Sequence, residues 1–106
     1  MMLNQQQCPE NNMGAIMDIV ESVLAPSLSE LEEEGSIDDW GVLTHAWGDE
    51  YNFNFYMVTQ NERAFLDAWD SLITKSNEAD PEWYDKLTPL CVAHKDNMYT
   101  LRDYAE

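Results

Sequence analysis

The chain has 106 residues, which is the size of one domain and too short for two full cores. Hydrophobic residues make up 44% and aromatic residues 11%, a composition that excludes an intrinsically disordered protein. The charge is strongly acidic, because 21 Asp and Glu residues oppose 5 Lys and Arg residues and give a formal net charge of −16. Such a field repels phosphate, so we expect no direct nucleic-acid partner and no membrane partner.

The first twelve residues are polar and include three consecutive Gln residues. We interpret 1–12 as a loose lead-in to a single domain over 13–106. The start lacks the basic and then apolar pattern of a signal peptide, and no apolar run approaches the roughly 20 residues that span a bilayer. Only Cys8 and Cys91 are available, and one lies in the lead-in. We therefore expect no disulfide scaffold, and a reducing, cytoplasmic location fits best.

A helical pattern starts at Met13. Apolar residues recur there with the spacing of one helix face, at Ile16, Ile19, Val20, Val23, Leu24, Leu28 and Leu31. Pro26 interrupts the pattern, so the helix either kinks or restarts at Ser27. Gly35 is a natural end.

Two segments rich in aromatic and β-branched residues follow, over 39–47 and 51–59. A loop that contains Gly48 separates them, which predicts a β-hairpin. Neither face of the first strand is purely polar. We therefore expect both sides of the hairpin to be covered, one by helices and the other by a partner subunit or a ligand.

The rest of the chain alternates helix and strand signals. Asn61 is the expected N-cap of a second amphipathic helix that extends to about Lys75. We expect a linker over 76–80, a short helix that starts at Pro81 and lasts until Pro89, and a last strand over 98–101.

The candidate chemistry depends on two histidines, because no phosphate loop, paired-cysteine metal motif or nucleophile elbow is present. His45 and His94, with Tyr56, are the candidate proton-transfer or orienting groups. If the two histidines met, a carboxylate of Asp49, Glu50 or Asp96 could complete a divalent metal site. The simpler interpretation is that each histidine hydrogen-bonds at a sheet edge. The spacing matches no known ligand motif, so we assign no metal and no particular cofactor, and leave open whether the protein is an enzyme.

Aromatic residues are dense on the hairpin and on the helices. They could line a pocket for an apolar or ring-shaped ligand, form a dimer interface, or simply belong to the core. The candidate ligand-binding residues are Trp40, Trp47, Phe55 and Trp69.

The run WGVLTHAWGDEYNFNFYMVTQNERAFLDAWDSL, followed by VAHKDNMYTL, resembles the ferredoxin-like half of the dimeric α/β-barrel superfamily. The resemblance implies an α+β, ferredoxin-like sandwich with an antiparallel sheet of three or four strands and two main helices on one face. It also implies a homodimer formed through the open face of the sheet, and a small apolar or aromatic ligand held between the sheet and its helices. The superfamily has a strand before the first helix, for which 1–12 is a poor candidate.

The acidity supports an alternative function from another class. An acidic surface can copy a phosphate backbone and block a basic nucleic-acid-binding protein. The contact residues would be Glu30, Glu32, Glu33, Glu34, Asp38, Asp39, Asp49 and Glu50.

Overall fold

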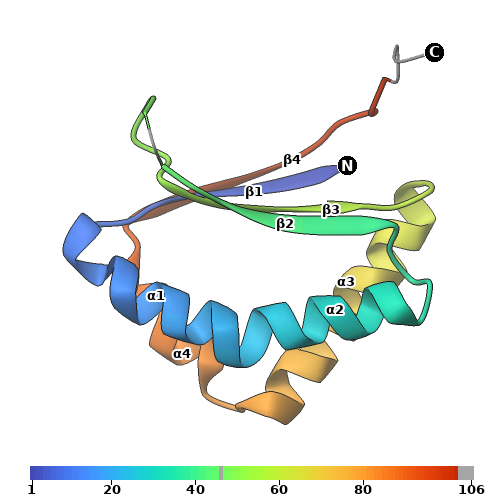
Figure 1. The fold of residues 1–106 in the computed structure, drawn as a ribbon, viewed down its shortest axis with the longest axis horizontal. Coiled ribbons are helices and arrows are strands. Elements are labelled where there is room, and N and C mark those ends of the chain that lie inside the picture. The colour runs from blue at the N-terminus through green and yellow to red at the C-terminus, as the bar shows by residue number, and fades with distance from the viewer. Residues whose placement is uncertain (46, 103–106) are drawn as a thin grey trace.

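A computed structural model of the chain describes residues 1–45 and 47–102. Four strands form one antiparallel sheet, and the helices all lie on one of its faces (Figure 1). The strands and helices follow the order Met2–Gln7 (β1), Met13–Ile19 (α1), Ala25–Glu33 (α2), Asp39–Thr44 (β2), Phe53–Val58 (β3), Glu62–Ala79 (α3), Trp83–Leu87 (α4) and Ala93–Met98 (β4). The sheet order β2-β3-β1-β4 is that of a ferredoxin-like sandwich, the fold class that the resemblance implies.

The first long helix passes Pro26 without restarting. One turn of π-helix, Val20–Leu24, joins α1 to α2. This turn accommodates Pro26, which has no backbone N–H to donate to the helix. The Ser27 hydroxyl donates to the Val23 carbonyl at 2.7 Å, so this serine does not cap a new helix. The predicted apolar face is confirmed, because all its members except the half-buried Ile19 are buried against the sheet.

The prediction that 1–12 is a loose lead-in is wrong for Met2–Gln7, which forms the central strand β1. This strand pairs with β3 on one side and with β4 on the other. Its polar side chains hid it, because Asn and Gln have no strand preference of their own. Hydrogen bonds to two neighbouring strands and the burial of Met2 and Asn4 outweigh that weak propensity.

Two boundaries in the second half also differ from the predicted ones. Helix α3 continues through the predicted linker to Ala79, because Ser76 lies on its buried face. Strand β4 covers Ala93–Met98 and not 98–101. Its polar residues are held by the backbone ladder with β1, which a pattern of side chains does not reveal.

A disulfide joins Cys8 to Cys91, although no disulfide scaffold was expected from the sequence. Cys8 follows β1 and Cys91 precedes β4. Because these strands are antiparallel neighbours, the two cysteines meet at the same end of the sheet, next to the hydrogen bond from Val92 N to Gln7 O at 2.8 Å. A reducing compartment was expected because no disulfide scaffold was expected, so the bond leaves that expectation without support.

The core lies between the sheet and the helices. Phe53, Phe55 and Met57 of β3 point into it, as their alternation predicted. The other face of the sheet carries no helix (Figure 1).

Candidate functional site

A cavity of about 300 Å³ lies between the sheet and the helices α3 and α4. Its roof is formed by β1, β3 and β4, and it opens beside β4, where several of the lining residues are exposed. The lining is mostly apolar and comprises Leu24, Phe53, Phe55, Trp69, Leu72, Ile73, Trp83, Tyr84, Leu87, Cys91, Val92 and Ala93, with Asn4, Gln6, Thr88, His94 and Asp96 as its polar members.

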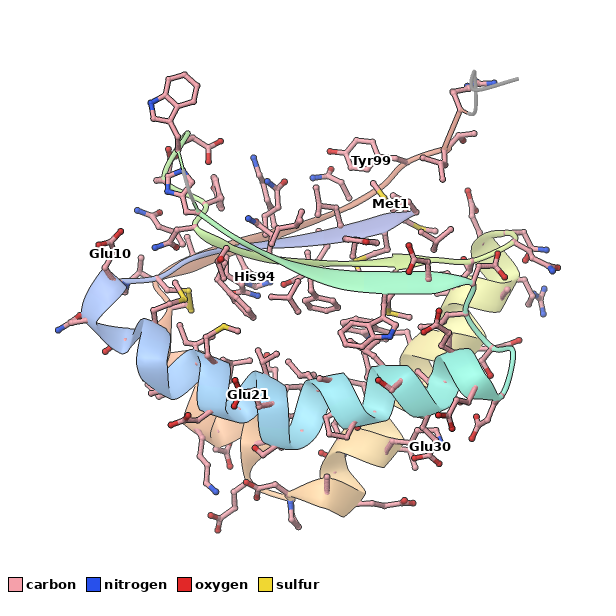
Figure 2. All side chains as sticks on the ribbon, viewed as in Figure 1. Met1, Glu10, Glu21, Glu30, His94 and Tyr99 are labelled. Atoms are coloured by element: carbon pink, nitrogen blue, oxygen red, sulfur yellow. A yellow bond between two sulfur atoms is a disulfide. The ribbon has the colours of Figure 1, made fainter. Side chains whose placement is uncertain are left out.

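Four polar side chains form a group on the roof of the cavity. In the register of β1 and β4, Asn4 lies opposite Asp96 and Gln6 lies opposite His94. Directly opposed residues share a face of the sheet, so all four are on the side of the helices. Figure 2 shows His94 on that side. We call Asn4, Gln6, His94 and Asp96 the polar quartet.

Hydrogen bonds order three members of the polar quartet. The Gln6 amide donates from Nε2 to Asn4 Oδ1 at 3.0 Å, and Asn4 Nδ2 donates to Asp96 Oδ1 at 2.5 Å. Asn4 is 5% exposed, so its amide has one fixed orientation between the two neighbours. This chain of bonds fixes the Asp96 carboxylate at the edge of the cavity.

Aromatic rings line the cavity from two sides: Phe55 lies on the roof beside its cross-strand partner Asn4, and Trp69, Trp83 and Tyr84 come from α3 and α4. The rings of Phe55 and Trp69 are parallel within 3°, with centroids 6.4 Å apart. The indole of Trp83 donates from Nε1 to Asn77 Oδ1 at 2.9 Å, which fixes that ring against the floor. Tyr84 packs edge-on against Trp83 and is 58% exposed at the opening.

The charge of the lining has one sign. Asp96 is its carboxylate, and among the described residues neither Lys nor Arg lines the cavity. The side chain of Lys95 is on the other face of the sheet from Asp96, because side chains alternate along a strand. Its Nζ lies 4.2 Å from the centroid of the Tyr51 ring. The cavity can therefore take a flat apolar body and offer hydrogen-bond acceptors to its polar end.

The structure brings three of the predicted site residues together. Phe55, Trp69 and His94 all line the cavity. Trp40 faces the helices from β2, where it packs against the core beyond β3. The side chain of Tyr56 lies on the opposite face of the sheet, over Gly41.

His45 and Trp47 lie outside the cavity, in the exposed hairpin, and Trp47 is 95% exposed. His45 and His94 do not meet as a shared metal site would require, because β2 and β4 are the two opposite edges of the sheet. Within residues 1–45 and 47–102, no group of three His, Cys, Asp or Glu side chains could hold a metal ion.

Sequence reasoning missed most of the polar quartet. Asn4 and Gln6 were placed in the lead-in, and Asp96 was considered only as a metal ligand. The signal that could have revealed them is the spacing of two, which Asn4 and Gln6 share with His94 and Asp96. Polar residues that alternate within a strand on the core side of a sheet commonly mark a site.

The acidic residues of the alternative hypothesis lie in two places. Asp49 and Glu50 are in the loop after β2. The others lie around the end of α2 and at the start of β2. Two members of that larger group pair with α3, because Lys75 Nζ lies 2.7 Å from Glu30 Oε1 and 2.9 Å from Glu34 Oε1. These hydrogen bonds raise the pKa of Lys75 above its ordinary value.

Comparison with known proteins shows the fold and no family. No family model matches the chain. No curated protein matches it either. The crystal structure of protein Atu4242 from Agrobacterium tumefaciens is similar with a TM-score of 0.68 and 11% sequence identity, over 97% of this chain and 93% of that one. None of the helices in the described part of the chain is long and apolar enough to cross a membrane.

Proposed function

We propose that the chain binds a small, mainly apolar ring compound in the cavity between the sheet and the helices α3 and α4. The observation that carries this proposal is the presence of aromatic rings and an ordered polar group around the same cavity of about 300 Å³. A site of this kind buries the body of a ligand on apolar side chains and orients it with a few polar atoms. Trp69 supplies a half-buried ring for stacking, and the polar quartet supplies the orientation.

Calorimetric titration with a neutral ring compound, 2-naphthylmethanol, tests the proposal. Trp69→Leu removes the stacking ring and is expected to weaken binding about tenfold, given that an aromatic pair adds roughly 1 kcal/mol to its buried area. Trp47→Leu is the matched control, because Trp47 is 95% exposed and outside the cavity. Thr88→Trp fills the opening from an exposed position and does not disturb the core. Equal affinities for all four proteins would overturn the proposal.

We further propose that the chain belongs to the dimeric α/β-barrel superfamily and forms a homodimer through the uncovered face of its sheet. The support is the ferredoxin-like order of strands together with that face, which presents Leu3, Leu43, Tyr56 and Val58. Leu43 is 49% exposed, although it lies within a strand. A second copy would bury these apolar side chains.

Light scattering at low and high salt tests the dimer. A dimer of this kind is expected to have the same mass at both, because apolar contacts are not screened. Leu43→Glu places a charge in the proposed interface and should give monomers. Leu66→Glu places the same charge on α3, where Leu66 is 59% exposed, and should not. A monomer of the unaltered chain at every salt would contradict the homodimer.

A second candidate function is that of an acidic protein that blocks a basic nucleic-acid-binding partner. One observation favours it: Glu32, Glu33, Asp38 and Asp39 are all exposed around the end of α2. Binding to such a partner should weaken steeply with salt, and changing these four residues to their amides should abolish it. A second variant, with Asp49 and Glu50 changed to their amides, measures the contribution of the loop after β2 separately from that of the residues around the end of α2. Unchanged binding by the fourfold variant would reject this role.

A further inference from the structure

We infer that the cavity selects ligands that carry a positive charge, such as a protonated amine or an amidine on an aromatic body. This inference rests on the proposed binding function and specifies its ligand class. The Asp96 carboxylate is its basis, since it is the acidic side chain at the opening of a cavity whose lining is mostly apolar and aromatic.

One oxygen of the Asp96 carboxylate accepts a hydrogen bond from a side chain, and among the described residues the other accepts none. Asn4 Nδ2 donates to Asp96 Oδ1, and the buried Asn4 amide is itself fixed by Gln6. In the part of the chain that the structure describes, no other side-chain hydrogen bond reaches Asp96, and no Lys, Arg or His lies within ion-pair distance of it. The second oxygen is therefore oriented and ready to accept a bond from a ligand.

The identity of the ligand's charge follows from the cost of desolvation. A neutral ring seated below β4 would displace water from Asp96 and offer it no counter-charge, which is unfavourable for an ionised carboxylate. A protonated amine replaces that water with a charge-assisted hydrogen bond. An anion meets Asp96 itself and the field of a chain with a net charge of −16.

The remaining walls suit the apolar part of such a ligand. Trp69, Trp83 and Tyr84 line the same cavity as the polar quartet, and ring faces attract a cation as well as stacking on an aromatic body. Lys95, the base nearest to Asp96 in the sequence, has its Nζ over the Tyr51 ring. Among the described residues, neither Lys nor Arg lines the cavity, and its basic side chain, His94, forms no ion pair with Asp96.

Three probes of the same shape test the inference by calorimetry: 2-naphthylmethylamine, 2-naphthylmethanol and 2-naphthoate at neutral pH. The amine is expected to bind roughly tenfold more tightly than the alcohol, which is the low end for a hydrogen bond to a charged group because Asp96 is partly solvated. The carboxylate should bind most weakly.

Asp96→Asn locates the effect. The new amide oxygen can still accept from Asn4, so the hydrogen-bond chain and the shape of the cavity are kept while the charge is lost. The preference for the amine over the alcohol should then fall to about onefold, with the affinity for the alcohol retained. Asp39→Asn is the matched control, because it removes an equal charge from an exposed position on β2, at the other edge of the sheet, and should leave the preference intact.

The outcomes separate this inference from the proposed function. If the amine and the alcohol bind equally and both lose affinity in Trp69→Leu, the cavity binds rings and its preference for cations is refuted. If the preference persists in Asp96→Asn, the charge of Asp96 is not its source, and the inference fails. If none of the three probes binds, the proposed function fails with it.

Discussion

The side chain of Asn52 pairs with the backbone of Cys8 in both directions. Cys8 N donates to Asn52 Oδ1 at 2.9 Å, and Asn52 Nδ2 donates to Cys8 O at 2.6 Å. Both residues are buried, and Cys8 lies just beyond the last residue of β1. The amide thus makes with Cys8 the pair of hydrogen bonds that a residue of a neighbouring strand would make. These bonds fix the end of β1 next to the disulfide.

Asn52→Asp should destabilise the fold strongly. The carboxylate cannot donate to the Cys8 carbonyl, and it places a charge in a buried position, so we expect a loss of about 3 kcal/mol in the free energy of unfolding. Urea denaturation measures this loss. Asn97→Asp makes the same change at an exposed position of β4 and should cost little. Equal midpoints for the two variants would show that the pairing with Cys8 does not contribute.

The disulfide should add a large part of the stability of so small a domain. Its cysteines are 83 residues apart, and the chain-entropy relation gives about 4–5 kcal/mol for a loop of that length. The double variant with Cys8→Ser and Cys91→Ser should lose this amount in urea denaturation, and a reductant should lower the midpoint of the unaltered chain only. Titration of free thiols in the folded protein should find none. Two reactive thiols without reductant would contradict the bond.

The sequence predicted the elements with strong side-chain patterns and missed those held by backbone pairing. The stripe from Ile16 to Leu31 and the alternation of Phe53, Phe55 and Met57 encode burial directly, and they are confirmed. Strand β1 has no such pattern, because Asn4 and Gln6 face the core side. Their polarity concealed the strand, and the same polarity builds the polar quartet.

Three residues of the candidate site were therefore within reach of the sequence. Trp69 and Phe55 were recognised as aromatic residues of helix and strand, and His94 as a titratable group. Their meeting depends on the sheet order, in which β1 and β4 are neighbours although 92 positions separate Asn4 from Asp96. That order follows from a central strand that side-chain periodicity could not detect.

Gly41 and Tyr56 form a cross-strand pair in which the tyrosine ring covers the glycine. A Cβ added at Gly41 would lie 2.5 Å from the Tyr56 ring. Gly41→Ala should destabilise the protein by about 1–3 kcal/mol, as expected for overpacking. Gly14→Ala has nothing within 4 Å and lies in α1, so it should stabilise by roughly 0.5–1 kcal/mol. Thermal denaturation compares the two.

The double variant Gly41→Ala with Tyr56→Ala identifies the cause. Removing the ring should make the Gly41→Ala change nearly neutral relative to Tyr56→Ala alone. If Gly41→Ala is equally harmful with and without the ring, contact with Tyr56 is not its cause.

Ser76 is fully buried on α3, and its hydroxyl has no hydrogen-bond partner in residues 1–45 and 47–102. Ser76→Ala removes an unsatisfied polar atom and improves helix propensity, so the free energy of unfolding should rise by about 1–2 kcal/mol. Ser22→Ala is the control, because the Ser22 hydroxyl is exposed and already donates to the Asp18 carbonyl. Urea denaturation in which Ser76→Ala proves less stable than the unaltered chain would show that the hydroxyl is satisfied.

Lys75 connects α2 to α3 and should make stability fall at alkaline pH. Its bonds to Glu30 and Glu34 raise its pKa in the folded protein. A raised pKa contributes stability that is complete below the unfolded value of about 10.4 and is lost as pH rises through the folded one. Unfolding curves from pH 9 upward should show this loss, weakened by salt because all three groups are near the surface. Lys75→Met should remove the alkaline dependence, whereas Lys95→Met, which takes an equal charge from β4, should retain it. Parallel curves for Lys75→Met and the unaltered chain would show that the bridge adds nothing to the fold.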